Sequence, residues 1–279
     1  MQLWVDSILA EHQRQPIDLI IVNGDVSLDF WSDGGSYIEN QIKETEIFIK
    51  EYVSQLPKDV PVVVLPGNHE QYDDVTWLNM TGNARNRVYE LGNNLFIMLD
   101  LYRVDETHQQ EGNGKYTPLT EEEVKKLRTQ IEQYSNHNVY IISHYIDMAK
   151  QNTADGGAFK TLLEEKDNII ALFAGHTHKS SVLGEGENTY GGKTVAQTGH
   201  FSYFTSDFTD ADKTIDNFWG FRDLIITADS AYSRYITADC SQYATQLSQY
   251  GVASPDGNYG RREIYSVTYY ETDGIIYGE

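Results

Sequence analysis

Short apolar runs alternate with amphipathic stretches along the first two thirds of the chain. The runs are rich in Val, Ile and Leu, which is typical of strands buried on both faces of a parallel sheet. They occupy residues 17–22, 60–65, 95–99, 139–142 and 169–173. Between them apolar residues recur at helical spacing, which predicts helices over residues 3–13, 37–56, 120–134 and 157–165. This alternation of strands and helices predicts an α/β fold.

Local signals define several ends of these predicted helices. Pro16 and Pro57 follow the first two helical patterns, and proline cannot continue a helix because it lacks an amide hydrogen. Thr120 and Glu123 form a capping box at the start of the third pattern. Residues 71–87 show no clear period, and we expect them to be irregular.

The pattern changes after residue 180, where glycines become frequent. Residues 193–198 and 264–270 alternate apolar and polar positions like half-exposed strands. The Tyr-, Ser- and Ala-rich residues 228–250 are a candidate for a helix. Together these features predict one domain over residues 1–279, with a second, antiparallel sheet and C-terminal elaborations after about residue 180.

The amino-acid composition limits which kinds of molecule the protein can bind. Hydrophobic residues make up 40% of the 279 residues, enough to build a large core. Asp and Glu outnumber Lys and Arg by 42 to 21, a formal charge of -21, which argues against a nucleic-acid-binding surface and against an anionic membrane as partner. No apolar run approaches the ~20 residues of a membrane-spanning helix, so we expect no membrane segment.

The single cysteine, Cys240, excludes an intrachain disulfide and a Cys-rich zinc site. The first ten residues lack the basic segment of a signal peptide. A cytoplasmic location is therefore the default expectation.

Four of the predicted strands end in polar groups of the same few kinds. The segments are Gly24-Asp25, Gly67-Asn68-His69-Glu70, Ser143-His144 and Gly175-His176-Thr177-His178. In an open α/β sheet, the carboxyl ends of parallel strands meet at one edge. If these strands share a sheet, their polar groups converge there.

The chemistry of these side chains points to metal ions. Imidazole nitrogens and carboxylate or carboxamide oxygens suit Mn, Fe or Zn. In an extended segment His176 and His178 project from the same side, so they can reach adjacent ions. A carboxylate such as Asp25 can bridge two ions about 3.5–4 Å apart, the separation common in enzymes that hydrolyse phosphoesters.

With these motifs the chain resembles the calcineurin-like metallophosphoesterase family. That family carries Asp-x-His, Gly-Asp-x-x-Asp, Gly-Asn-His-Asp/Glu, a later lone His and Gly-His-x-His, and four of the five motifs occur here. The resemblance implies a four-layer α/β (α+β) fold, with a central β-sandwich of two mixed sheets flanked by helices. It also implies a phosphatase or phosphodiesterase with a dinuclear metal centre and a metal-bridging hydroxide.

The resemblance assigns roles to particular residues. The implied metal ligands are Asp25, Asn68, His144, His176 and His178. In this assignment Asp25 bridges the ions, and His178 serves the second ion. His69 is the implied catalytic acid, which protonates the leaving group or steadies the transition state.

The chain departs from the family pattern at two places. No Asp-x-His stands upstream of Gly24, so we expect the first core strand to be missing, the N-terminus to be incomplete with room for a leader upstream, and the His178 site to lack two ligands. Leu28 stands where the family has its second Asp, and Asp29, one place later, is a weaker candidate to orient His69.

Other polar residues near the motifs have alternative interpretations. Glu70 either starts a helix or hydrogen-bonds a ligand residue, and His200 either contacts substrate or simply closes a strand. Arg85 and Arg87 either contact phosphate or form ordinary ion pairs.

Two function classes follow from the sequence. The first is a metal-dependent phosphoester hydrolase acting on a phosphorylated small molecule or protein. The alternative is a catalytically impaired or non-catalytic protein that binds a phospho-ligand or a partner, because Asp-x-His is absent. A metallo-β-lactamase-like hydrolase would need a His-x-His-x-Asp-His run, which the chain lacks.

Overall fold

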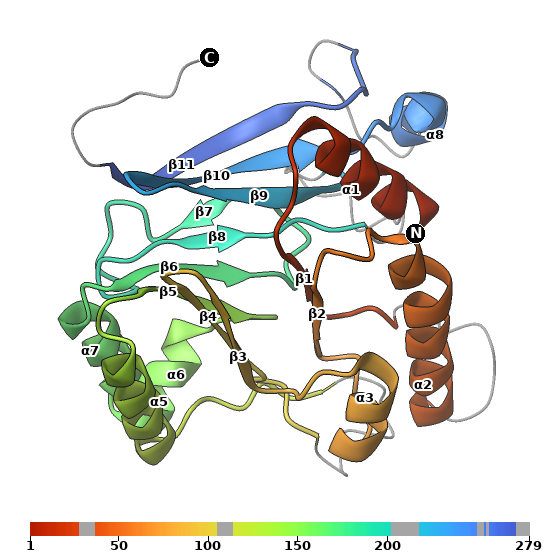
Figure 1. The fold of residues 1–279 in the computed structure, drawn as a ribbon. Helices are drawn as coiled ribbons and strands as arrows, with labels where there is room; N and C mark the ends of the chain where they lie inside the picture. Colours follow the sequence, from red (N-terminus) through yellow and green to blue (C-terminus); the bar gives the residue numbers. More distant parts are fainter. Residues whose placement is uncertain (28–36, 105–113, 202–217, 250–253, 255–256, 272–279) are drawn as a thin grey trace.

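The computed structural model describes residues 1–27, 37–104, 114–201, 218–249, 254 and 257–271. Its centre is a six-stranded sheet (Figure 1). Helices α5, α6 and α7 pack on one face of this sheet, and two smaller sheets pack on the other. Helices α1 and α2 pack in turn against strand β1 of the smaller sheets. The predicted mixed α/β fold with flanking helices is confirmed.

The six-stranded sheet has the order β3-β4-β5-β6-β8-β7. Its strands are β3 (Arg87–Leu91), β4 (Asn94–Leu99), β5 (Asn138–Ser143), β6 (Ile169–Ala174), β7 (Val182–Leu183) and β8 (Val195–Gln197). Neighbours from β4 to β8 are parallel, and the edge strands β3 and β7 are antiparallel to theirs. Ser143 pairs with Ala174, so β5 and β6 end side by side.

Strand β4 shows why the central runs are apolar throughout. Leu95 and Ile97 belong to the core under the helices, whereas Phe96 and Met98 belong to the core between the sheets. Because successive side chains of a strand point to opposite faces, a strand covered on both faces needs apolar residues at every position.

The second layer consists of two separate sheets. Strands β1 (Ile20–Asn23) and β2 (Val62–Leu65) form a parallel pair. Strands β9 (Gly220–Ile226), β10 (Ser230–Thr237) and β11 (Glu263–Glu271) form an antiparallel sheet. The sequence led us to expect one mixed sheet here. Instead, a cavity of about 630 Å³, lined by residues of both β1 and β9, separates the two sheets.

The α-helices are α1 (Gln2–Arg14), α2 (Tyr37–Ile47), α3 (Asp74–Thr81), α5 (Glu121–Gln133), α6 (Met148–Asp155), α7 (Ala158–Glu165) and α8 (Ala244–Gln249). A π-helical turn (Phe48–Tyr52) and a 3-10 turn (Val53–Gln55) continue α2, and another 3-10 turn (Ser241–Tyr243) precedes α8. The predicted capping box of Thr120 and Glu123 begins α5.

One prediction of local structure was wrong, and another was only partly right. Residues 71–87 contain α3, which begins where Asp73 accepts a hydrogen bond from the Thr76 amide (2.9 Å) and ends at Gly82, whose φ is +68°. Eight residues are too few to show a clear helical period. The candidate helix in residues 228–250 is present, but only as the short α8 near their end, and strand β10 occupies much of the rest. Within the described ranges, no helix has the length and apolar character needed to cross a bilayer.

Candidate metal centre

Four of the predicted ligands lie on loops that follow strands. Asp25 follows β1, Asn68 follows β2, His144 directly follows β5, and His176 follows β6. Asn23 at the end of β1 donates from Nδ2 to the Ser143 carbonyl (3.1 Å), which ties the second layer to the central sheet. The predicted convergence of strand ends therefore occurs, although the strands belong to two layers.

The polar atoms of these four side chains meet at one point. Asp25 Oδ2 and Asn68 Oδ1 each lie 3.0 Å from His144 Nε2. Asn68 Oδ1 also lies 2.9 Å from His176 Nδ1, which is 3.3 Å from His144 Nε2. The ligand atoms of Asp25, His144 and His176 all lie within 4.8 Å of one another.

The ring of His144 is fixed by its other nitrogen. Nδ1 donates a hydrogen bond to the carbonyl of Asn23 (2.7 Å), so Nε2 faces the cluster. His144 is only 3% exposed. A hydrogen bond of this kind commonly fixes the tautomer of a metal-binding histidine.

Aromatic rings enclose His176. Tyr145 lies against it with ring centroids 4.8 Å apart, and the Tyr102 hydroxyl is 3.5 Å from its Nε2. The Tyr102 contact leaves Nδ1 toward Asn68. Because these contacts join residues far apart in sequence, no local signal pointed to Tyr102, Tyr145 or Asn23 as members of the site.

The backbone at the cluster is unusual. Asp25, His176 and His178 have φ values of +56°, +66° and +57°, in the left-handed region that residues other than glycine rarely adopt. Such conformations cost of order 1–3 kcal/mol each and concentrate at functional sites. All three residues lie on the loops after β1 and β6.

The protonation of the cluster follows from burial and mutual charge. Burial acts to raise the pKa of Asp25, but the neighbouring imidazoles of His144 and His69 outweigh it, so this pKa lies well below its usual range. Burial, followed by repulsion from His144, lowers the pKa of His176 to about 4. At neutral pH Asp25 is thus an anion, and His176 carries a lone pair.

These residues fit a divalent ion. A carboxylate, a carboxamide oxygen and two imidazole nitrogens form a donor set that Mn, Fe and Zn accept. Their oxygen and nitrogen atoms lie about 3 Å from one another. Like-charged electron pairs at this separation repel unless a proton or a cation lies between them.

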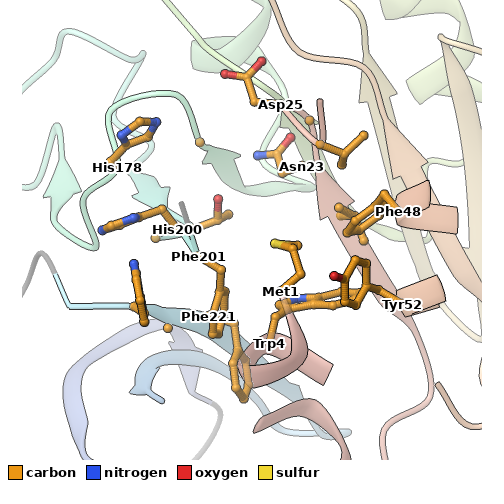
Figure 2. A pocket seen from close by; sticks show the side chains of 18 of the residues that line it. Met1, Trp4, Asn23, Asp25, Phe48, Tyr52, His178, His200, Phe201 and Phe221 are labelled. Atoms are coloured by element: carbon orange, nitrogen blue, oxygen red, sulfur yellow. The ribbon is translucent and has the colours of Figure 1, made fainter. Parts of the chain in front are cut away.

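His178 lies outside this three-residue group but lines the same cavity as Asp25 and His176. Its ring stacks on that of His200, with centroids 5.3 Å apart. Figure 2 shows His178 and His200 on the side of the cavity opposite Phe48 and Tyr52. The structure therefore brings His200 into the site region, beside His178.

The other predicted site residues have distinct positions. The His69 amide donates to Asp25 Oδ1 (3.1 Å), which places His69 next to two of the proposed ligands. Glu70 is fully buried beneath the same loops. Asp29 lies outside the described residues. Arg85 is buried and pairs with Asp100 (3.3 Å), so it anchors this segment and does not face the cluster.

The fold and the cluster together define a protein of the metallophosphoesterase class. The model of the calcineurin-like phosphoesterase family matches residues 2–180, and the chain belongs to this family. No curated protein sequence matches the chain. The chain is similar to the crystal structure of a dimetal phosphatase from Danio rerio, with 13% identity and a TM-score of 0.61, over 97% of this chain and 89% of that one. At this identity, the likeness shows a shared fold.

Proposed function

We propose that this protein is a metal-dependent phosphoester hydrolase with a dinuclear centre, acting on a phosphorylated small molecule or protein. The observation that carries the proposal is the convergence of Asp25, His144 and His176 within 4.8 Å, with Asn68 beside them. Membership of the calcineurin-like phosphoesterase family supports the reaction class. The dimetal phosphatase with the same fold supports two ions.

The first ion would be held by Asp25, Asn68, His144 and His176, and the second by Asp25 and His178. Bound Mn, Fe or Zn would supply Lewis acidity toward phosphoryl oxygens and would acidify water at neutral pH. The protein contributes rigid placement, because hydrogen bonds, ring contacts and burial fix each of the first four side chains.

We assign the proton transfer to His69. Its backbone amide donates to Asp25 Oδ1, so the residue lies next to the proposed metal ligands. A histidine is suited to give a proton to a leaving oxygen near neutral pH. Asp25, fixed as an anion, would hold His69 and the ion in a constant relation.

We further infer that the cavity between β1 and β9 is where the additional core strand expected from the sequence would lie. Each of these strands has one hydrogen-bonded strand neighbour among the described residues, and both line the cavity. Asn23 Oδ1 is buried there and accepts no hydrogen bond from the described part of the chain. An extended segment at this place would join the two small sheets into one and would pass beside Asp25 and His178, which line the same cavity.

His176→Ala tests the hydrolase proposal. The variant should lose metal-dependent hydrolysis of an aryl phosphate, because it removes one imidazole of the cluster, while circular dichroism and the unfolding temperature stay close to those of the wild type. His137→Ala is the matched control, since His137 lies near Glu90 at a distance from the cluster and should leave turnover unchanged. Unchanged turnover in His176→Ala would refute the proposal.

The alternative is a protein that binds a phospho-ligand without hydrolysing it. It is favoured by one observation: in the described ranges, a single group of three ligands is present, and His178 is not part of it. Elemental analysis of bound metal, combined with an aryl phosphate assay, separates the two functions. Two ions with turnover support the hydrolase, and at most one ion with no turnover supports the binder.

A further inference from the structure

The side chain of Glu70 is wholly buried and accepts four hydrogen bonds. Oε2 accepts from the amides of Asp25 (3.0 Å) and Gly67 (2.6 Å). Oε1 accepts from the amide and the hydroxyl of Ser27 (3.1 and 2.7 Å). Within the described residues no ion pair involves this carboxylate. These four hydrogen bonds supply the partners that a buried carboxylate requires.

The four donors come from the two loops that carry candidate ligands. Asp25 and Ser27 belong to the loop after β1, and Gly67 belongs to the loop after β2, directly before Asn68. These loops touch so closely that a Cβ atom on Gly67 would overlap Asp25 Oδ1. Glu70 thus connects the two loops at a point where they pack too closely for an added side chain.

The backbone of Glu70 is held in place by Arg85. Arg85 donates to the carbonyl of Glu70 (2.8 Å) and pairs with the buried Asp100. Asp25 has φ +56°, which requires support from its surroundings. The bond from its amide to Glu70 supplies that support, because the amide direction is set by this φ value.

We propose that Glu70 is a positioning residue that fixes Asp25 and Asn68 in the geometry that binds the first ion. This inference rests on the proposed metal site, and it resolves the two interpretations of Glu70 in favour of a hydrogen-bond partner of the ligand loops. Glutamine cannot replace it, because its amide would turn a donor toward backbone donors at one of the two oxygen positions.

The test compares Glu70→Gln with the wild type, using Co²⁺ alone and no phosphoester. Affinity is measured by calorimetry, ligand geometry by the visible absorption of bound Co²⁺, and stability by thermal unfolding of the metal-free protein. We expect Glu70→Gln to bind Co²⁺ about 10–100-fold more weakly, with an altered spectrum, as is typical when a hydrogen-bond partner of a ligand is lost. In metal-free protein, the amides of Asp25 and Gly67 should also exchange faster with solvent.

Glu11→Gln is the matched control, since Glu11 is another buried carboxylate but lies in helix α1. It should reduce stability without changing Co²⁺ affinity. Equal Co²⁺ affinity of Glu70→Gln and the wild type would overturn the proposal, as would an equal loss in Glu11→Gln. If wild-type protein binds Co²⁺ yet hydrolyses no phosphoester, the proposed function fails while the role of Glu70 stands.

Ser27→Ala covers the case in which Glu70→Gln does not fold. It removes only the hydroxyl donor to Glu70 and leaves three of the four hydrogen bonds. A weaker but measurable loss of Co²⁺ affinity supports the proposal. Unchanged affinity and an unchanged Co²⁺ spectrum would overturn it.

Discussion

At the scale of single residues, the candidate centre is tightly packed, as Gly67 shows. Gly67 has an ordinary backbone conformation, yet a Cβ there would overlap the Asp25 carboxylate and come within 2.6 Å of the Asp25 amide. The glycine of the Gly-Asn-His-Glu motif is therefore required because a side chain would clash with Asp25, and not because of its backbone conformation. It allows the loops after β1 and β2 to approach until Asp25 and Asn68 share one point.

Gly67→Ala should displace Asp25 and weaken Mn²⁺ binding by at least tenfold. The added methyl has no room, and forcing extra atoms into a packed site costs about 1–3 kcal/mol. Titration calorimetry with Mn²⁺ measures the loss. Gly260→Ala, at a glycine where the new atom would come no closer than 3.1 Å to Asn258, should leave binding unchanged. Equal Mn²⁺ affinity of the two variants would contradict this account of the site.

The protonation of His144 predicts how metal binding depends on pH. Burial acts to lower the pKa of His144, but the Asp25 carboxylate outweighs it, so the pKa lies above its ordinary value. An ion at Nε2 has to displace this proton, whereas His176 is already neutral above about pH 5 because its pKa is lowered to about 4. Mn²⁺ affinity should therefore rise about tenfold per pH unit from pH 6 until His144 has lost its proton. Affinity that does not change between pH 6 and 8 would contradict the assignment.

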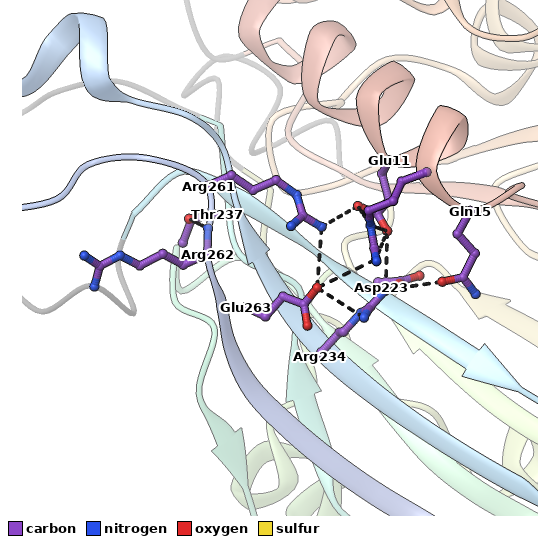
Figure 3. A network of polar contacts seen from close by, with 9 residues as sticks. Glu11, Gln15, Asp223, Arg234, Thr237, Arg261, Arg262 and Glu263 are labelled. Atoms are coloured by element: carbon purple, nitrogen blue, oxygen red, sulfur yellow. Dashed lines mark hydrogen bonds and ion pairs between the residues drawn. The ribbon is translucent and has the colours of Figure 1, made fainter. Parts of the chain in front are cut away.

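At the scale of elements, helix α1 is held to the antiparallel sheet by a buried carboxylate (Figure 3). Glu11 is 2% exposed and pairs with Arg14 of its own helix, with Arg234 of β10 (3.3 Å) and with Arg261 just before β11 (2.5 Å). Arg234 also pairs with Asp223 of β9 (2.9 Å). Arg234 also pairs with Glu263 of β11. One network of ion pairs thus connects helix α1 with β9, β10 and β11.

Glu11→Gln should lower stability at neutral pH by about 1.5–3 kcal/mol, toward the lower end because Arg14 and Arg261 are partly exposed. Burial acts to raise the pKa of Glu11, but Arg14 and Arg261 outweigh it and hold the pKa below its ordinary value. A lowered folded-state pKa gives stability that is present above the unfolded-state pKa, about 4.3, and is lost as pH falls through the folded-state pKa.

Urea unfolding at several pH values measures this effect. The wild type should exceed Glu11→Gln in stability at pH 7, and the difference should shrink below about pH 4. Glu132→Gln, which alters an exposed pair with Lys166, should change stability little at any pH. A difference for Glu11→Gln that is constant from pH 3 to 7 would contradict the network as its cause.

Some strands could be recognised from the sequence and others could not. Strands β4, β5 and β6 are visible as apolar runs because both of their faces are covered. Strands β9 and β10 carry Asp223 and Arg234, whose charges interrupt any strand pattern. Glu11, which pairs with Arg234, lies 223 residues away from it. No local sequence window therefore contains the pair that makes this charge compatible with a buried sheet.

At the scale of the whole molecule, the strand ends of two layers gather their polar residues on one side of the fold. Asp25, Asn68, His144 and His176 could be named from sequence because each lies shortly after the end of an apolar run. The contacts that fix them could not, because Asn23 meets His144 across 121 residues and Tyr102 meets His176 across 74. The division of the second layer around a cavity also emerges only in three dimensions.

The most direct test of the account is an anomalous difference map from a crystal of the protein soaked in Mn²⁺. We expect a peak within bonding distance of Asp25, Asn68, His144 and His176, at the point where their ligand atoms converge. The peak should be absent from crystals of His176→Ala treated in the same way. An ordered wild-type crystal that binds Mn²⁺ elsewhere, with no peak among these four side chains, would contradict the central claim.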